Sequence, residues 1–187
     1  TFKGGTDVFV GLSNYIELFH NETFLMVFKN TFIFTIGCLV VQFTIGFIFA
    51  LFFSKKFTLA GPIRGMILVG YMMPMSVTAL LGKNMFDVSS GVINDLFMKL
   101  GLINAPVEWL LNGSTAMIAI IAVNCWVGIP FNMLLLTSGL TGISTEIYES
   151  AEVDGANPLQ RFLYITLPLM KPAILSVLML GFIYTFK

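Results

Sequence analysis

Residues 141–172 read TGISTEIYESAEVDGANPLQRFLYITLPLMKP, and this polar stretch near the C-terminal end decides the fold class. Four carboxylates fall within nine positions, at Glu146, Glu149, Glu152 and Asp154. Uncharged apolar sequence lies on both sides of the stretch. Charged side chains are costly inside a bilayer, so we expect a water-facing element held between two membrane-spanning segments.

Local signals in this stretch predict two short helices joined by a turn. Ser144 is an N-cap candidate, because its hydroxyl can accept from the free N–H groups of a first helical turn. Asp154-Gly155 is expected to end the first helix, since glycine adopts the left-handed conformation at little cost. Asn157-Pro158 then fits a second helix start, with proline at the first helical position.

The composition of the whole chain indicates a membrane protein. Hydrophobic residues make up 57% of the 187 and charged residues 11%, against about 25% charged in a typical soluble domain. Mean hydropathy is +0.90. The formal net charge is zero, which leaves no basic footprint for nucleic acid. We therefore predict an all-α membrane protein, built as a polytopic helical bundle.

Runs of uncharged residues locate the membrane spans, since a bilayer core about 30 Å thick needs about 20 helical residues. The predicted spans lie near residues 24–53, 63–83, 114–140 and 173–187. We expect sharp bends near Pro74 and Pro130, because proline removes a backbone hydrogen bond. Pro168 and Pro172 are expected to break the chain before the last span.

A longer pattern overlaps the two short helices. It consists of Glu149-Ser150-Ala151, Asp154-Gly155-Ala156, Phe162, Ile165-Thr166-Leu167-Pro168 and Lys171-Pro172. The pattern resembles the EAA loop of permease subunits in binding-protein-dependent ABC importers, and its spacing is most similar to the carbohydrate-uptake branch. Two positions depart from it: Ser150 replaces the commoner Ala, and Ser144 stands where sugar permeases often have Pro. The alternative is an ordinary amphipathic loop between membrane helices.

The resemblance implies that this loop docks into a cleft of a cytoplasmic ATPase subunit. ATP and Mg would be bound by that partner, and no cofactor is expected in this chain. Glu149 would be the polar contact, with Ser150 and Ala151 small enough for close approach. Gly155 would make the turn, which Asp154 caps or braces. The expected docking residues are Glu149, Ser150, Ala151, Asp154, Gly155 and Ala156.

The resemblance also implies one transmembrane permease domain over residues 1–187, with four of the family's six spans and with a first and a last helix missing. Expected partners are the ATPase subunits, a second similar permease, an extracytoplasmic solute-binding protein and the lipid bilayer of a bacterial or archaeal cell membrane. Residues 54–64 and 141–172 would be cytoplasmic, and residues 84–113 external. Lys and Arg are nearly balanced between the two sides, so this orientation rests mainly on the resemblance.

Five residues inside the spans are candidates for a solute path. Polar side chains in hydrocarbon usually face the bundle interior or a water-filled route, which singles out Gln42, Asn124 and Asn132. Tyr71 and Trp126 have rings that can stack on a sugar. Hydrogen bonding between helices and core packing are the alternative roles. No ionisable residue lies deep in a predicted span, which argues against a proton relay.

Residues 91–101 predict one further helix, between the second and third spans. Its apolar face would hold Ile93, Leu96, Phe97 and Leu100. Its polar face would hold Asn94, Asp95 and Lys99. Two placements remain open: flat in the membrane interface with Trp109 following, or packed on neighbouring loops.

Catalytic functions find little support in the sequence. Cys38 and Cys125 fall inside apolar spans and are interpreted as small buried hydrophobes, and His20 is the only histidine. An intramembrane enzyme would need a nucleophile–base pair or metal ligands, and no Walker motif for ATP hydrolysis is present. The predicted function is a non-catalytic importer subunit for a sugar or oligosaccharide. Glycerol phosphate and polyamine are the alternative solutes.

Overall fold

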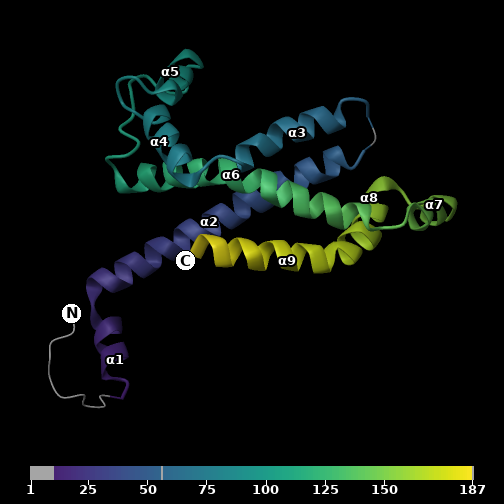
Figure 1. Ribbon diagram of the computed structural model, residues 1–187, viewed down its shortest axis with the longest axis horizontal. Helices are drawn as coiled ribbons and strands as arrows, with labels where there is room; N and C mark the ends of the chain where they lie inside the picture. Colours follow the sequence, from purple (N-terminus) through teal and green to yellow (C-terminus); the bar gives the residue numbers. More distant parts are fainter. Residues whose placement is uncertain (1–10, 56, 187) are drawn as a thin grey trace.

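The computed structural model describes residues 11–55 and 57–186, and Figure 1 shows how their helices are arranged. Residues 1–10, Lys56 and Lys187 of the expected domain lie outside this described part. The elements are α1 (Ser13–His20), α2 (Glu22–Phe53), α3 (Ala60–Tyr71), α4 (Met75–Met85), α5 (Val92–Lys99), α6 (Gly113–Thr141), α7 (Thr145–Val153), α8 (Pro158–Arg161), the π-helical segment η1 (Phe162–Thr166) and α9 (Leu167–Phe186).

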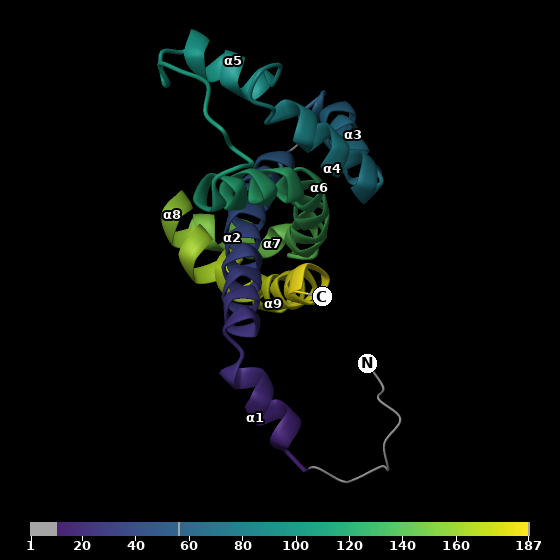
Figure 2. The same cartoon turned by 90° about the vertical axis from the view of Figure 1, so that its left-hand side faces the viewer.

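Three long helices, α2, α6 and α9, form the body of the molecule (Figures 1 and 2). The contact between α2 and α6 is the most extensive, and α9 packs against both. α2 and α6 run in the same direction, and α9 returns in the opposite one. Buried apolar side chains from all three meet in a core of Ala50, Leu136, Leu140, Met170 and Val177.

Three described helices are long and apolar enough to cross a membrane: Glu22–Phe53, Gly113–Thr141 and Pro158–Phe186. The pair α3 and α4 adds a fourth when it is counted as one span. Large apolar side chains on these helices are exposed in the single chain, among them Val40 at 60% and Met179 at 68%. Such surfaces fit hydrocarbon or a partner helix. The predicted all-α membrane fold is confirmed.

The second predicted span is interrupted, not only bent. α3 ends at Tyr71, α4 begins at Met75, and the two helices are bent by 92° relative to each other. Pro74 precedes α4 with ψ 138°. A proline there has no N–H for the preceding turn, and it disfavours helix in the residue before it. The two halves form a broken span or a re-entrant loop. At Pro130, by contrast, α6 continues without interruption.

The prediction that Pro168 and Pro172 break the chain is wrong. α8, η1 and α9 form one continuous helix from Pro158 to Phe186. Inside η1 the N–H of Leu167 bonds to the carbonyl of Phe162, five residues earlier. Membrane helices tolerate proline through such local π adjustments, which satisfy backbone groups that the ring would leave free. The last helix is therefore joined to the polar loop without a break.

Two groups of connections lie at opposite ends of the bundle (Figure 1). The connection between α2 and α3 lies at the same end as α7 and α8, whereas α5 and its loops lie at the other end. Nη2 of Arg64 donates to the carbonyl of Phe53 (2.7 Å), which ties α3 to the C-terminal end of α2. A cation is favourable there, because that end of a helix carries partial negative charge.

Asn94 of α5 lies opposite to where the sequence predicts it. Expected on the water-facing side, it is 2% exposed. Its Oδ1 accepts from the N–H of Val107 (3.1 Å) and from Nε1 of Trp109 (2.8 Å). The apolar Leu96 and Leu100 are exposed instead. These contacts favour the second of the two open placements, in which α5 packs on neighbouring loops.

Candidate functional site

Helix α7 begins and ends where the sequence predicts. Oγ of Ser144 accepts from the backbone N–H two residues later (3.3 Å), so Ser144 is the N-cap. At the other end Gly155 has φ +79°. The N–H of Ala156 donates to the carbonyl of Ala151 (2.9 Å), and that of Gly155 donates to the carbonyl of Glu152 (3.0 Å). This pair of bonds is a Schellman motif, which requires one left-handed residue.

Helix α8 starts with a reciprocal cap. Oδ1 of Asn157 accepts from the N–H of Gln160 (2.9 Å), and Oε1 of Gln160 accepts from the N–H of Asn157 (2.9 Å). Pro158 occupies the first helical position, where no intrahelical partner exists for an N–H. Both predicted helix starts in this region are therefore confirmed, and both rest on local contacts.

Two side-chain contacts hold α7 against the helix that follows it. Nη1 of Arg161 lies 2.9 Å from Oε2 of Glu152. Oη of Tyr148 and Oγ1 of Thr166 are hydrogen-bonded at 2.9 Å, and Thr166 is buried. Arg161 and Thr166 belong to the continuous helix that ends in α9. The polar loop is therefore attached directly to the last long helix.

The expected docking residues gather at the tip of this loop. Glu149 and Ser150 are exposed on α7, and Ala151 is half-buried. Asp154, Gly155 and Ala156 line a shallow hollow of about 330 Å³. The other residues that line it are Gln160, Tyr164 and Ile165. Asp154 is the C-cap residue of α7.

Apolar side chains around the tip are also exposed. Val153 is 88% exposed, Tyr164 is 77% exposed and Leu159 is 65% exposed. Large apolar side chains left exposed beside polar groups are typical of a protein interaction site. The tip of the loop thus combines carboxylates, a hollow and apolar groups on a rigid support.

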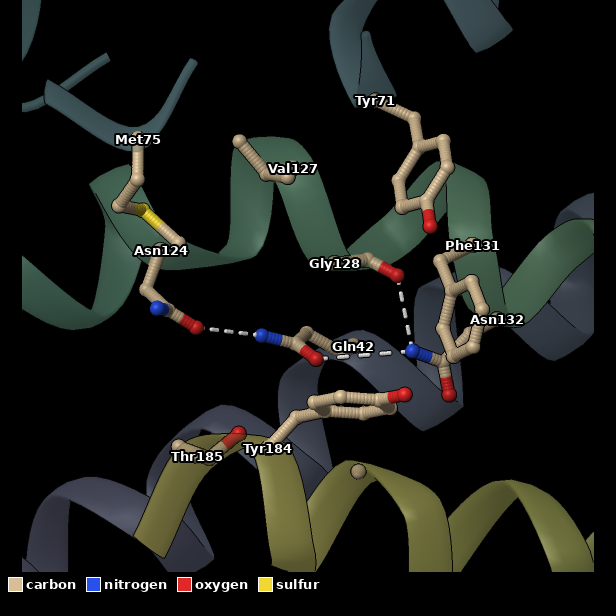
Figure 3. Close-up of a pocket in the computed structure, with 11 residues that line it drawn as sticks. Gln42, Tyr71, Met75, Asn124, Val127, Gly128, Phe131, Asn132, Tyr184 and Thr185 are labelled. Carbon is tan, nitrogen blue, oxygen red and sulfur yellow. Dashed lines mark hydrogen bonds between the residues drawn. The ribbon is translucent and has the colours of Figure 1, made fainter. Parts of the chain in front are cut away.

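A second candidate site is a cavity of about 270 Å³ between α2, α6, α9 and the broken helix (Figure 3). Four of the five path residues predicted from the sequence line it: Gln42, Tyr71, Asn124 and Asn132. The remaining lining residues are Met75, Val127, Gly128, Phe131, Gly181, Tyr184 and Thr185. None of the lining residues is charged.

Three amides form a chain of hydrogen bonds across this cavity (Figure 3). Nε2 of Gln42 donates to Oδ1 of Asn124 (2.7 Å). Nδ2 of Asn132 donates to Oε1 of Gln42 (3.5 Å) and to the carbonyl of Gly128 (2.8 Å). Both Gln42 and Asn132 are buried. The polar residues chosen from the sequence therefore meet in one network.

Aromatic rings border the same cavity. Tyr71 and Phe131 are stacked, with ring centroids 5.5 Å apart. Phe131 also meets Tyr184 edge to face, at 6.4 Å. The cavity thus places neutral hydrogen-bonding groups beside aromatic faces.

Trp126 is not part of this cavity. Its ring lines hollows elsewhere between α6 and the α3–α4 pair, and its side chain lies against Gly70. We therefore remove Trp126 from the candidate path. Tyr184 and Thr185 were not singled out from the sequence, although they are polar residues in an apolar span and carry the same signal as Asn124.

The two cysteines occupy the interface between α2 and α6. Cys38 and Cys125 are both buried, and neither forms a disulfide bond. Sγ of Cys125 lies 4.0 Å from the carbonyl oxygen of Cys38. Within residues 11–55 and 57–186 no cluster of three or more His, Cys, Asp or Glu side chains is placed to hold a metal.

Comparison with known proteins identifies curated relatives along nearly the whole chain. The chain is 33% identical to the trehalose/maltose transport system permease protein MalF of Thermococcus litoralis, over 92% of this chain and 58% of that one. It is 31% identical to the arabinooligosaccharides transport system permease protein AraP of Bacillus subtilis, over 96% and 57%. It is 32% identical to the sn-glycerol-3-phosphate transport system permease protein UgpA of Yersinia pestis, over 98% and 61%. The chain therefore spans somewhat more than half the length of these relatives.

A solved structure shares the fold. The crystal structure of a bacterial ABC transporter involved in the import of the acidic polysaccharide alginate superposes with a TM-score of 0.80. The match is 24% identical and covers 94% of this chain and 62% of that chain. The model of one protein family matches residues 42–187, which include both candidate sites. This chain belongs to the family of binding-protein-dependent transport system inner membrane components.

Proposed function

We propose that this chain is a transmembrane subunit of an ATP-driven importer. The cavity between α2, α6 and α9 forms part of the solute path, and the 141–172 loop docks an ATPase subunit that binds ATP and Mg. Support comes from the family, whose members are inner membrane components of binding-protein-dependent transport. The partners are the ATPase, a second permease of the same kind and an external solute-binding protein. The loop end of the bundle is cytoplasmic in this arrangement.

The continuous helix from Pro158 to Phe186 is the observation that carries this proposal. Its first turns are fixed to α7 by Arg161 and Thr166. Its last turns contribute Tyr184 and Thr185 to the cavity. A helix transmits displacement along its axis with little loss, so an ATPase that moves α7 also moves the cavity wall. The segment η1 provides a wider turn at which the helix can adjust.

The surface of the loop suits a partner that grips it. Exposed Glu149 and Ser150 face outward, and Val153, Leu159 and Tyr164 supply apolar area that water does not stabilise. The hollow beside Gly155 offers space for a side chain of the partner. An ATPase that docks at this loop makes no contact with the membrane-facing helices, so it can remain in the cytoplasm.

Neutral sugars are the solute class that best fits the cavity. Hydroxyl groups pair with amide side chains such as Asn124 and Asn132, and sugar rings stack on aromatic faces such as Tyr71 and Phe131. A volume of about 270 Å³ is slightly smaller than the roughly 300–1,000 Å³ common for ligand pockets. It therefore holds about one sugar ring, and a second permease supplies the remaining wall.

Glycerol phosphate is the second candidate, because one relative is named for that solute. A phosphate group is normally held by Arg, Lys or backbone N–H groups. None of the residues that line the cavity is charged. The lining therefore favours the sugar proposal over this one.

The test uses the complete importer in proteoliposomes, with maltose, trehalose, arabinotriose and sn-glycerol 3-phosphate as solutes, each with its binding protein. We expect uptake of at least one of the three sugars together with stimulated ATP hydrolysis. Uptake of glycerol phosphate alone would overturn the sugar assignment. ATP hydrolysis that proceeds without any solute movement would overturn the transport function.

A further inference from the structure

We infer that Gln42 is a positioning residue of the solute path: it fixes the orientation of Asn124 and does not itself bind the solute. This inference rests on the proposed function, since it assigns a role within the proposed path. It concerns the crossing of α2 and α6, where the chain of amides begins.

The amide of Gln42 lies against Gly128 at the crossing of α2 and α6. A Cβ added at Gly128 of α6 would overlap Cδ of Gln42, so the amide occupies the place where another residue would have its side chain. The crossing is reciprocal. A Cβ added at Gly46 of α2 would lie 2.7 Å from Cβ of Asn132. Gly128 of α6 thus faces Gln42 of α2, and Gly46 of α2 faces Asn132 of α6. Gln42 is only 5% exposed.

Both ends of the Gln42 amide are already used. Nε2 donates to Oδ1 of Asn124 at 2.7 Å, and Oε1 accepts from Nδ2 of Asn132 at 3.5 Å. Asn132 is held separately by its bond to the carbonyl of Gly128 (2.8 Å). Gln42 is only 5% exposed, whereas Asn124 is half-buried, so a solute in the cavity meets the amide of Asn124 more readily than that of Gln42.

The consequence falls on Asn124. Because its oxygen accepts from Gln42, its Nδ2 points away from Gln42, as Figure 3 shows. Asn124 is only half-buried and lines the cavity. It therefore presents a hydrogen-bond donor to the solute, which matches the oxygen of a sugar hydroxyl or ring. Without Gln42 the amide of Asn124 is free to turn and offer its oxygen instead.

A role in packing alone makes a different prediction. Methionine is unbranched and similar in length to glutamine, so Gln42→Met keeps the slot beside Gly128 filled while removing both hydrogen bonds. If Gln42 only fills space, transport by the Gln42→Met importer equals that of the wild type. If Gln42 positions Asn124, the half-saturating solute concentration rises about tenfold, the equivalent of one lost hydrogen bond, with little change in the maximal rate.

The experiment is a double-mutant cycle of Gln42→Met and Asn124→Ala in the complete importer, with uptake measured for the solute that the wild type carries among the four solutes named above. If Gln42 acts through Asn124, then in the Asn124→Ala background Gln42→Met should raise the half-saturating solute concentration by less than about twofold. Additive losses would show direct contact between Gln42 and the solute and would overturn the inference. Equal uptake by wild type and Gln42→Met would overturn it too.

Two measures keep the result interpretable. Co-purification of the ATPase subunit reports assembly of each variant. If Gln42→Met does not assemble, Gln42→Asn runs the same cycle, because its amide is one methylene too short to reach Asn124. A wild type that carries only sn-glycerol 3-phosphate would overturn the sugar proposal, while the cycle would still be measured with that solute.

Discussion

At each end of the bundle a helix ends in the same type of turn. At one end α7 closes in a Schellman motif around Gly155, with φ +79°. At the other end α5 closes in the same motif around Gly101, with φ +68°. A Cβ added at either glycine would meet no atom within 4 Å. Backbone strain and available space are therefore alike at the two turns.

The side chains around the two turns differ. Near Gly155 the carboxylate of Glu149 and the apolar Val153 face outward. Near Gly101 the central polar side chain, Asn94, faces inward and holds its own loop together. The exposed side chains near Gly155 are available to a partner such as the proposed ATPase, whereas Asn94 is used within its own loop. A turn geometry shared by two sites thus says little about function, which depends on the side chains that the turn carries.

The largest effect is expected from matched substitutions at the two turns. Gly155→Val and Gly101→Val each force a β-branched residue into the left-handed region, at a cost on the order of 1–3 kcal/mol. If the 141–172 loop docks the ATPase as proposed, Gly155→Val should lower uptake more than about tenfold, because it misplaces that loop. Gly101→Val should retain most uptake. Transport in proteoliposomes measures both.

Recovery of folded protein provides the control for this pair. Both variants should insert and resist heating to a similar degree, since the strain is the same. Similar losses of uptake from both substitutions would remove the functional distinction between the two ends.

The next effect concerns the inward-facing Asn94. Asn94→Leu leaves the N–H of Val107 and Nε1 of Trp109 without their buried partner, which should favour local opening by about 2–4 kcal/mol. Hydrogen exchange should rise in residues 86–111 and stay unchanged in α7. The exposed Asn104 gives the matched control, and Asn104→Leu should change neither region. Faster exchange in α7 would mean that the two ends are coupled.

These two regions also show what sequence reasoning can reach. The start and end of α7 and the start of α8 depend on Ser144, Gly155 and Asn157, each acting on a neighbour within five residues. Such signals are visible in the sequence, and the family pattern overlaps them. The burial of Asn94 depends on contacts 13 and 15 residues away. Helical periodicity places Asn94 beside Asp95 and Lys99, so the sequence favours the wrong face.

The membrane portion shows the same limit. Gln42, Asn124 and Asn132 stand out as polar residues in apolar spans, but their meeting depends on the register between α2 and α6, over separations of 82 and 90 residues. The same register turns Trp126 away from the cavity. Proline at position 168 predicts a break that the π turn avoids. The amide network and the placement of Trp126 are set by tertiary packing, whereas the π turn is a backbone adjustment within one helix.

A smaller effect is expected from reversing charge at the two ends. Glu149→Lys changes an exposed contact at the docking end, and Glu108→Lys makes the same change at the other end. If Glu149 faces a polar group of the ATPase, its reversal should lower uptake and ATPase recovery by about tenfold. Glu108→Lys should lower neither. Full activity of the Glu149→Lys importer would remove Glu149 from the docking contact.

The smallest effect is expected from lowering the pH, which should change the loop before α5 and leave α7 unchanged. Asp87, in the loop before α5, accepts hydrogen bonds from the N–H and hydroxyl of Ser90 and from the N–H of Ser89. These bonds, with those from Ser90 the strongest, hold the pKa of the Asp87 carboxyl below its ordinary value of 3.8. The stabilisation is therefore complete above that value and is lost as pH falls through the lower, folded-state pKa.

The backbone of Asp87 links this titration to Asn94, because the carbonyl of Asp87 accepts from Nδ2 of Asn94 (3.4 Å). Protonation should therefore loosen the loop around Trp109, and the fluorescence of Trp109 in a Trp126→Phe background reports it. We expect a reversible change below about pH 4 that Asp87→Asn abolishes. The carboxyl is fully exposed, so the change should be small and should leave α7 unaffected. An unchanged titration in Asp87→Asn would assign the transition to another group and leave Asp87 without a role at this end of the bundle.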